Sequence, residues 1–183
     1  DLRCFGISYL HHSLGGISPS DLVLLGAPSG IGKTQICCSI ALANIRQGRK
    51  VHFLALEAEE FEIERRLKYQ LLADAFFLMP RETRPRVRLT YDRWVNGSLL
   101  EPLMELELHV AKIFEQNYRD LFIYYKQDRF TVVTLIKQVL EVSSETDLII
   151  IDHVHYFDFD DDNENRAMRE IAKTVRTLAL EEK

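Results

Sequence analysis

Residues 21–34 constrain the fold of this chain more than any other stretch. The apolar run Leu22–Leu25 predicts a buried strand, a glycine-rich turn follows it, and Lys33-Thr34 opens a helical pattern. This order is what a phosphate-binding loop requires, because the turn directs backbone N–H groups toward an anion at the positive end of the helix dipole. The predicted phosphate site consists of Ala27, Pro28, Ser29, Gly30, Ile31, Gly32, Lys33, Thr34 and Gln35.

Within this loop, each residue type has a physical task. Gly30 and Gly32 allow the backbone to curl into an anion-binding nest. Lys33 is expected to reach the β- and γ-phosphates of a nucleotide, and the Thr34 hydroxyl is expected to bind Mg²⁺. Ala27 stands where the consensus has its first glycine. The alternative, an ordinary turn with an exposed lysine, is disfavoured because a strand and a helix flank the motif.

Composition bounds the class of protein. The 183 residues are 46% hydrophobic and 28% charged, which is ordinary for one globular domain. The net charge of −5 argues against sequence-blind adhesion to nucleic acid, and no apolar run approaches the length of a membrane span. Neither an initiator Met nor a signal-peptide pattern begins the chain, so we interpret it as part of a longer polypeptide. The cysteines Cys4, Cys37 and Cys38 predict packing residues and a reducing, cytoplasmic compartment.

The remaining pattern predicts a single α/β domain over residues 1–183, with a lead-in at 1–20 and the core from 21. A strand, a helix and a strand within about 35 residues form a βαβ unit, so the sheet is expected to be mainly parallel and flanked by helices. The almost wholly apolar strand 147–152 is expected to be central. Further strands are expected at 51–56 and 121–125, and helices within 3–16 and at 32–47, 57–72, 99–116, 131–142 and 165–182.

Two carboxylates follow apolar strands and are candidates for chemistry. Asp152 ends the run Leu148–Ile151, so it is expected beside Thr34, where it could hold Mg²⁺. Glu57 ends the strand after the loop helix and could deprotonate an attacking water. The residues alone leave an alternative open for Glu57, because acidic residues also favour a helix N-terminus.

The layout resembles the RecA-type ATPase core, and most of all the C-terminal motor domain of DnaB-type replicative helicases. Residues 15–22, 51–57, 151–152 and 165–182 are similar to that family's segments. The resemblance implies ATP and Mg²⁺ as ligands, with Glu57 as catalytic base. It also implies single-stranded DNA as partner and a homo-oligomeric ring, in which a neighbour supplies an arginine. The sensor, arginine finger and DNA loops of such a motor would follow Lys183.

Several features depart from the family pattern. Gly30-Ile-Gly-Lys33 is nearer to the RadA and KaiC type, His153-Val-His155 replaces the usual Tyr-Leu-Gln, and the acidic loop 158–164 would repel DNA phosphates. An ATPase that acts as a regulatory or assembly switch therefore remains the alternative function. A nucleotide-binding module without turnover is a third, weaker option.

Three other signals suggest sites. The Asp158–Asp162 run lacks the glycine and the glutamate of a calcium loop, which favours a solvated acidic loop. His153 and His155 have no further ligand at a zinc-like spacing. The arginines between 81 and 88, near Tyr91 and Trp94, are compatible with nucleic-acid binding and equally with a basic surface turn.

Overall fold

The computed structural model describes residues 2–98, 100–158 and 164–181. The chain divides into two compact units. Residues 1–60 and 120–183 form one, called the sheet unit, and residues 61–119 form the other, called the helical unit. Within the described residues, no helix is both long and apolar enough to cross a bilayer.

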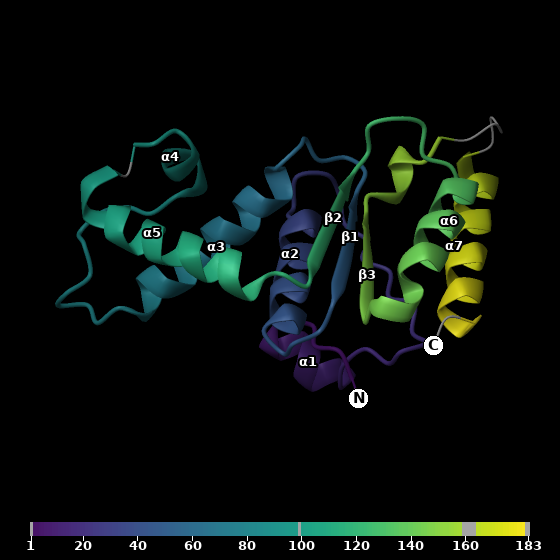
Figure 1. Ribbon diagram of the computed structural model, residues 1–183, viewed down its shortest axis with the longest axis horizontal. Coiled ribbons are helices and arrows are strands. Elements are labelled where there is room, and N and C mark those ends of the chain that lie inside the picture. Colours follow the sequence, from purple (N-terminus) through teal and green to yellow (C-terminus); the bar gives the residue numbers. More distant parts are fainter. Residues whose placement is uncertain (1, 99, 159–163, 182–183) are drawn as a thin grey trace. The chain divides into compact units, whose positions relative to one another are not determined.

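A parallel sheet is the centre of the sheet unit (Figure 1). Its strands are β1 (Val51–Ala55), β2 (Leu121–Tyr125) and β3 (Leu148–Asp152), in the order β2-β1-β3. β1 pairs in parallel with both neighbours, which confirms the predicted parallel sheet. The expectation that residues 147–152 form the central strand is wrong for the sheet described here, because β1 occupies the middle.

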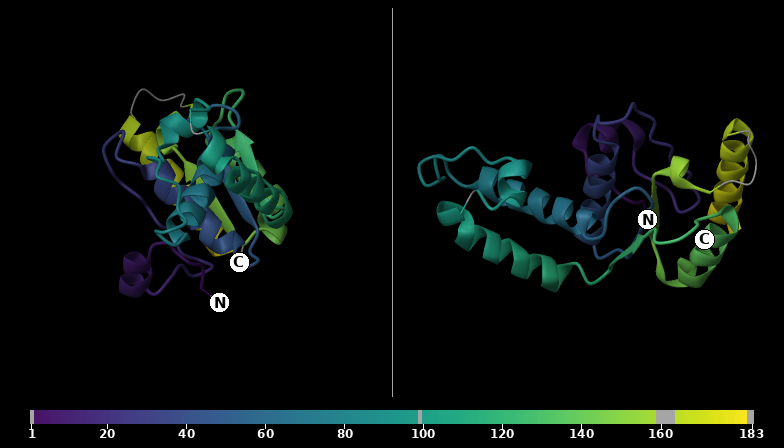
Figure 2. Two further views of the ribbon diagram at one scale, coloured as in Figure 1. Left: turned by 90° about the vertical axis from the view of Figure 1, so that its left-hand side faces the viewer. Right: turned by 90° about the horizontal axis from the view of Figure 1, so that it is seen from above.

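Helices cover both faces of this sheet. Figures 1 and 2 show α2 (Lys33–Ile45) on one face, and α6 (Val132–Val142) with α7 (Glu164–Glu181) on the other. Thr131 caps α6, since its hydroxyl accepts a hydrogen bond from the Thr134 backbone N–H at 3.3 Å. The remaining elements of the unit are α1 (Ser8–Leu14) and the short 3₁₀ helices η1 (Ser143–Glu145) and η2 (Val154–Tyr156).

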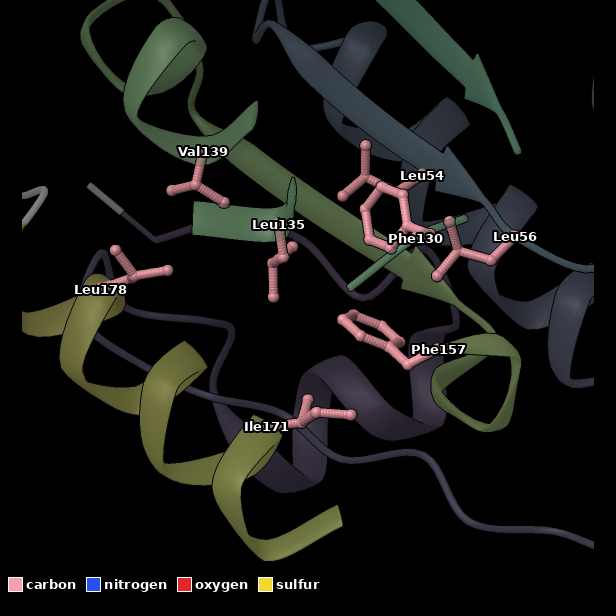
Figure 3. Packing of buried hydrophobic residues seen from close by; sticks show 8 residues of the cluster. All are labelled: Leu54, Leu56, Phe130, Leu135, Val139, Phe157, Ile171 and Leu178. Carbon is pink, nitrogen blue, oxygen red and sulfur yellow. The ribbon is translucent and has the colours of Figure 1, made fainter. Parts of the chain in front are cut away.

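The face covered by α6 and α7 holds a hydrophobic cluster (Figure 3). Side chains alternate along a strand, so Leu54 of β1 and Leu56 just after it point to this face, while Val51, Phe53 and Ala55 point to the other. Because Leu56 directly precedes Glu57, this packing fixes the chain at the end of β1. The other buried members of the cluster are Phe130, Leu135, Val139, Phe157, Ile171 and Leu178.

The prediction of a buried strand at Leu22–Leu25 is wrong. This segment has no assigned strand, and Leu24 is 74% exposed. A strand needs a hydrogen-bonded neighbour, and within the described residues β3 pairs only with β1. Residues 17–21 lie against other elements of the sheet unit instead: Arg176 of α7 donates to the Ser20 carbonyl. An apolar run indicates burial, but it does not provide the partner strand.

The helical unit contains α3 (Glu62–Leu78), α4 (Tyr91–Val95) and α5 (Leu100–Asn117). α3 begins at residue 62, later than the predicted 57, and α4 was not predicted. Arg84, one of the arginines with an open nucleic-acid alternative, donates to the carbonyls of Phe77 at 2.5 Å and Met79 at 2.7 Å, so it closes the C-terminal end of α3. The buried side chains Phe76 and Leu103 form the centre of this unit.

A buried asparagine ties the N-terminal segment to α2. Asn44 is fully buried. Its Oδ1 accepts from the Cys4 backbone N–H at 3.0 Å, and its Nδ2 donates to the Cys4 carbonyl at 2.7 Å. Both backbone groups of Cys4 therefore depend on one side chain, and a buried polar group without a partner is costly.

We expect Asn44→Ala to lower the free energy of unfolding by about 1–3 kcal/mol, because it leaves the Cys4 backbone groups unpaired. Urea unfolding followed by circular dichroism measures the change. The control is Asn165→Ala, at an exposed position of α7, with an expected change within about 0.5 kcal/mol. Equal effects of the two substitutions would contradict this role of Asn44.

Candidate functional site

The glycine-rich turn leads directly into α2. Gly30 and Gly32 have φ angles of 77° and 101°, a region that side chains with a Cβ rarely adopt, and Gly32 is the N-cap residue. The first N–H groups of a helix have no acceptor within the helix, so the start of α2 offers donors together with its positive dipole end. This end of α2 can bind an anion such as a phosphate.

Lys33 is bound to the turn that precedes it. Its Nζ donates to the carbonyl oxygens of Ala27 at 2.9 Å and Pro28 at 3.1 Å. These contacts hold the ammonium group over the loop rather than extended into solvent. A positive charge fixed there adds to the attraction of the backbone N–H groups for phosphate.

Asp152 is the last residue of β3 and is 4% exposed. The Thr34 side chain at the start of α2 is hydrogen-bonded to its carboxylate. Burial raises the pKa of Asp152 above its ordinary value, although the Thr34 hydrogen bond and the nearby Lys33 charge lower it, and the Glu57 charge adds to the increase. The structure thus brings Lys33, Thr34, Glu57 and Asp152 together in one electrostatic environment.

Strand register explains why the two carboxylates are neighbours. Ala55 of β1 pairs with Asp152 of β3, and the Leu56 N–H donates to the Asp152 carbonyl at 2.7 Å. Glu57 therefore follows at the same sheet edge. It is exposed and lies five residues before Glu62, where α3 begins. The alternative in which Glu57 opens a helix is thus not what the structure shows.

The donor set fits a magnesium ion. A hydroxyl and a carboxylate are hard oxygen ligands, and Mg²⁺ is commonly held by one or two carboxylates together with substrate phosphates. A buried carboxylate whose charge is disfavoured gains from a cation beside it. Among the described residues, no group of three or more His, Cys, Asp and Glu side chains is placed to hold a metal by itself. Residues 159–163 of the acidic loop lie outside the described residues.

Some neighbours of the site were missed by sequence reasoning. Cys37, one turn after Thr34, lies near Asp152: burial and that carboxylate raise the pKa of its thiol to about 12, so it stays protonated. Lys126 directly follows β2, and Tyr156 lies on η2 after β3. The rule that identified Glu57 and Asp152, a polar residue just beyond a parallel strand, also selects Lys126.

A parallel sheet whose strand ends meet a glycine-rich loop at a helix N-terminus is typical of phosphate-loop nucleotide-binding domains. The family model of the DnaB-like helicase C-terminal domain matches residues 5–183, and the chain belongs to this family, as the resemblance predicted. A comparison with curated proteins gives no match.

Solved structures share the fold. One of them, an isolated ATPase domain, superposes with a TM-score of 0.73 at 13% identity, covering 98% of this chain and 60% of that one. A DnaB-like replicative helicase, studied with its interactions with primase, superposes with a TM-score of 0.69 at 14% identity, covering 98% of this chain and 40% of that one. The RecA-like α/β fold class is thereby confirmed, and the chain spans less than two thirds of each of these structures.

The buried charge of Asp152 predicts a pH-dependent cost to stability. Its pKa is higher in the folded chain than the ordinary 3.8, so between these two values the folded state binds more protons, and stability falls as the pH rises. Above this window the full cost of burying the ionised form remains. We expect Asp152→Asn to be more stable than the wild type at pH 7, with a difference that shrinks toward pH 4.

Urea unfolding of both proteins across this pH range, without Mg²⁺ or nucleotide, measures that difference. Asp128→Asn, at an exposed position, serves as the control and should change stability by less than about 0.5 kcal/mol. A wild type that is more stable than Asp152→Asn at pH 7 would contradict the expectation.

Proposed function

We propose that this domain binds ATP with Mg²⁺ and hydrolyses it, and that hydrolysis drives movement on DNA as part of a replicative helicase. The observation that supports this most directly is the convergence of Lys33, Thr34, Glu57 and Asp152 in a chain of the DnaB-like helicase family. A nucleotide holder needs only the loop and its lysine. The additional exposed carboxylate, beside a second one that is buried, supplies what hydrolysis requires.

The proposed roles follow from the chemistry of each side chain. The N–H groups of the loop, from Ala27 to Gln35, and the Lys33 ammonium bind the phosphates and stabilise the negative charge that develops on them. Thr34 and Asp152 would hold Mg²⁺, which neutralises phosphate charge when it is bound. The Glu57 carboxylate orients a water molecule and takes its proton as the water attacks the γ-phosphorus, and ADP and phosphate are the products.

DNA binding and ring assembly belong to the same proposal. Replicative helicase action needs single-stranded DNA, and an arginine from a neighbouring subunit would complete each site of a homo-oligomeric ring. The family assignment supports both. The similar helicase that was studied with primase suggests a primase as a candidate partner for the protein that carries this domain.

We expect Glu57→Gln to lower the rate of ATP hydrolysis by about 100-fold or more, because the amide cannot accept the proton of water. Its affinity for ATP should change little, since Glu57 does not belong to the phosphate loop. Lys33→Ala is the matched comparison and should lose nucleotide affinity while its melting temperature is kept. Titration with a fluorescent ATP analogue and a phosphate-release assay measure the two properties. A wild-type hydrolysis rate in Glu57→Gln would remove this residue from the mechanism.

Single-stranded DNA distinguishes a helicase motor from a regulatory switch. For the motor we expect an oligonucleotide to stimulate ATP hydrolysis several-fold, with the effect declining as salt rises, because phosphate contacts release counterions. The assay uses the protein that carries this domain, with and without poly(dT). Hydrolysis that does not respond to DNA at any salt concentration would favour the switch.

A further inference from the structure

A tyrosine on the turn after β3 contacts the proposed catalytic base. Tyr156 ends η2, four residues beyond Asp152. Its hydroxyl donates to Oε1 of Glu57 at 3.4 Å. In the part of the chain that the structure describes, this is the one hydrogen bond that reaches the Glu57 carboxylate. Contacts of this kind are often long before substrate binds and shorten in the reactive complex.

The turn that carries this tyrosine is itself held in place. Lys126, just after β2, donates from Nζ to the Tyr156 carbonyl at 2.6 Å and forms an ion pair with Asp158 at 2.7 Å. Asp158 also accepts from the Phe130 backbone N–H at 2.6 Å, and these two hydrogen bonds lower the pKa of its carboxyl group. The ion pair is therefore formed at neutral pH, and the turn is bound to the end of β2.

The ring of Tyr156 has a further support. It lies edge-on to the His153 ring, with the centroids 5.9 Å apart and an angle of 80° between the planes. Its neighbours thus come from the ends of all three strands: Glu57 after β1, Lys126 after β2 and His153 after β3. Since Glu57 is exposed and flexible by itself, a held phenol can restrict its rotamers.

We propose that Tyr156 is a positioning residue for Glu57. By donating to Oε1, the phenol orients the carboxylate so that the other oxygen can take the proton of water. The inference rests on the proposed hydrolysis and adds to it, because neither the loop nor the magnesium ligands involve Tyr156. A positioned base raises the rate of the chemical step, whereas ATP binding by the loop does not depend on it.

The test is Tyr156→Phe, which removes only the hydroxyl at a residue that is 44% exposed, so the fold is expected to persist. We expect kcat for ATP hydrolysis to fall about 5- to 20-fold while KM changes less than about twofold, as for a lost hydrogen bond that orients a reacting group. Tyr9→Phe is the matched control, since Tyr9 is 78% exposed on α1, and its kcat should equal that of the wild type.

A double-mutant comparison separates positioning from general damage. In the Glu57→Gln background, Tyr156→Phe should change the residual rate by less than about twofold, because both substitutions remove the same function. An unchanged kcat in Tyr156→Phe, or an equal loss with and without Glu57, would overturn the positioning role. If Glu57→Gln is inactive while Tyr156→Phe is fully active, only this inference fails. If Glu57→Gln keeps the wild-type rate, the proposed mechanism fails with it.

Discussion

The parallel pairing of β1 with β3 is the constraint on which the candidate site depends. With Ala55 opposite Asp152, both chains leave the sheet at the same edge, and Glu57 follows within two residues. A shift of this register would move one carboxylate along the strand by roughly 3 Å per residue, beyond the reach of the other. Burial of Leu54 and Leu56 under α6 and α7 opposes such a shift, because a one-residue slip would turn these side chains to the other face.

The same arrangement imposes an electrostatic cost. Asp152 is nearly inaccessible to water and shares its surroundings with Glu57, so two negative groups meet where solvent screens one of them poorly. The Thr34 hydrogen bond and the Lys33 charge offset part of this cost. A magnesium-bound triphosphate brings a cation to Asp152 and would offset more of it. We interpret this disfavoured charge as a feature that favours ligand binding, as expected where residues are arranged for chemistry rather than for stability.

The sequence predicted much of the fold, and its failures have identifiable causes. Strands 51–56, 121–125 and 147–152 were found within one residue of their predicted limits, because β-branched and aromatic runs bounded by turns are a strong signal. Leu22–Leu25 has the same apolar character but no partner strand among the described residues, and pairing cannot be read from one segment. The acidic run after Glu57 gave too early a start for α3, since charge alone does not define a helix boundary.

By itself, the sequence determined the type of local structure and the chemistry available: a glycine-rich turn with Lys33 and Thr34, and carboxylates just beyond two strands. Those properties depend on residue identity and short spacing. Only the tertiary structure decided which groups meet, namely the Thr34 hydroxyl with Asp152, Lys33 with its own loop, and Tyr156 with Glu57. Tyr156 and Glu57 are 99 residues apart in the chain, and contacts over such distances follow from strand order, register and burial.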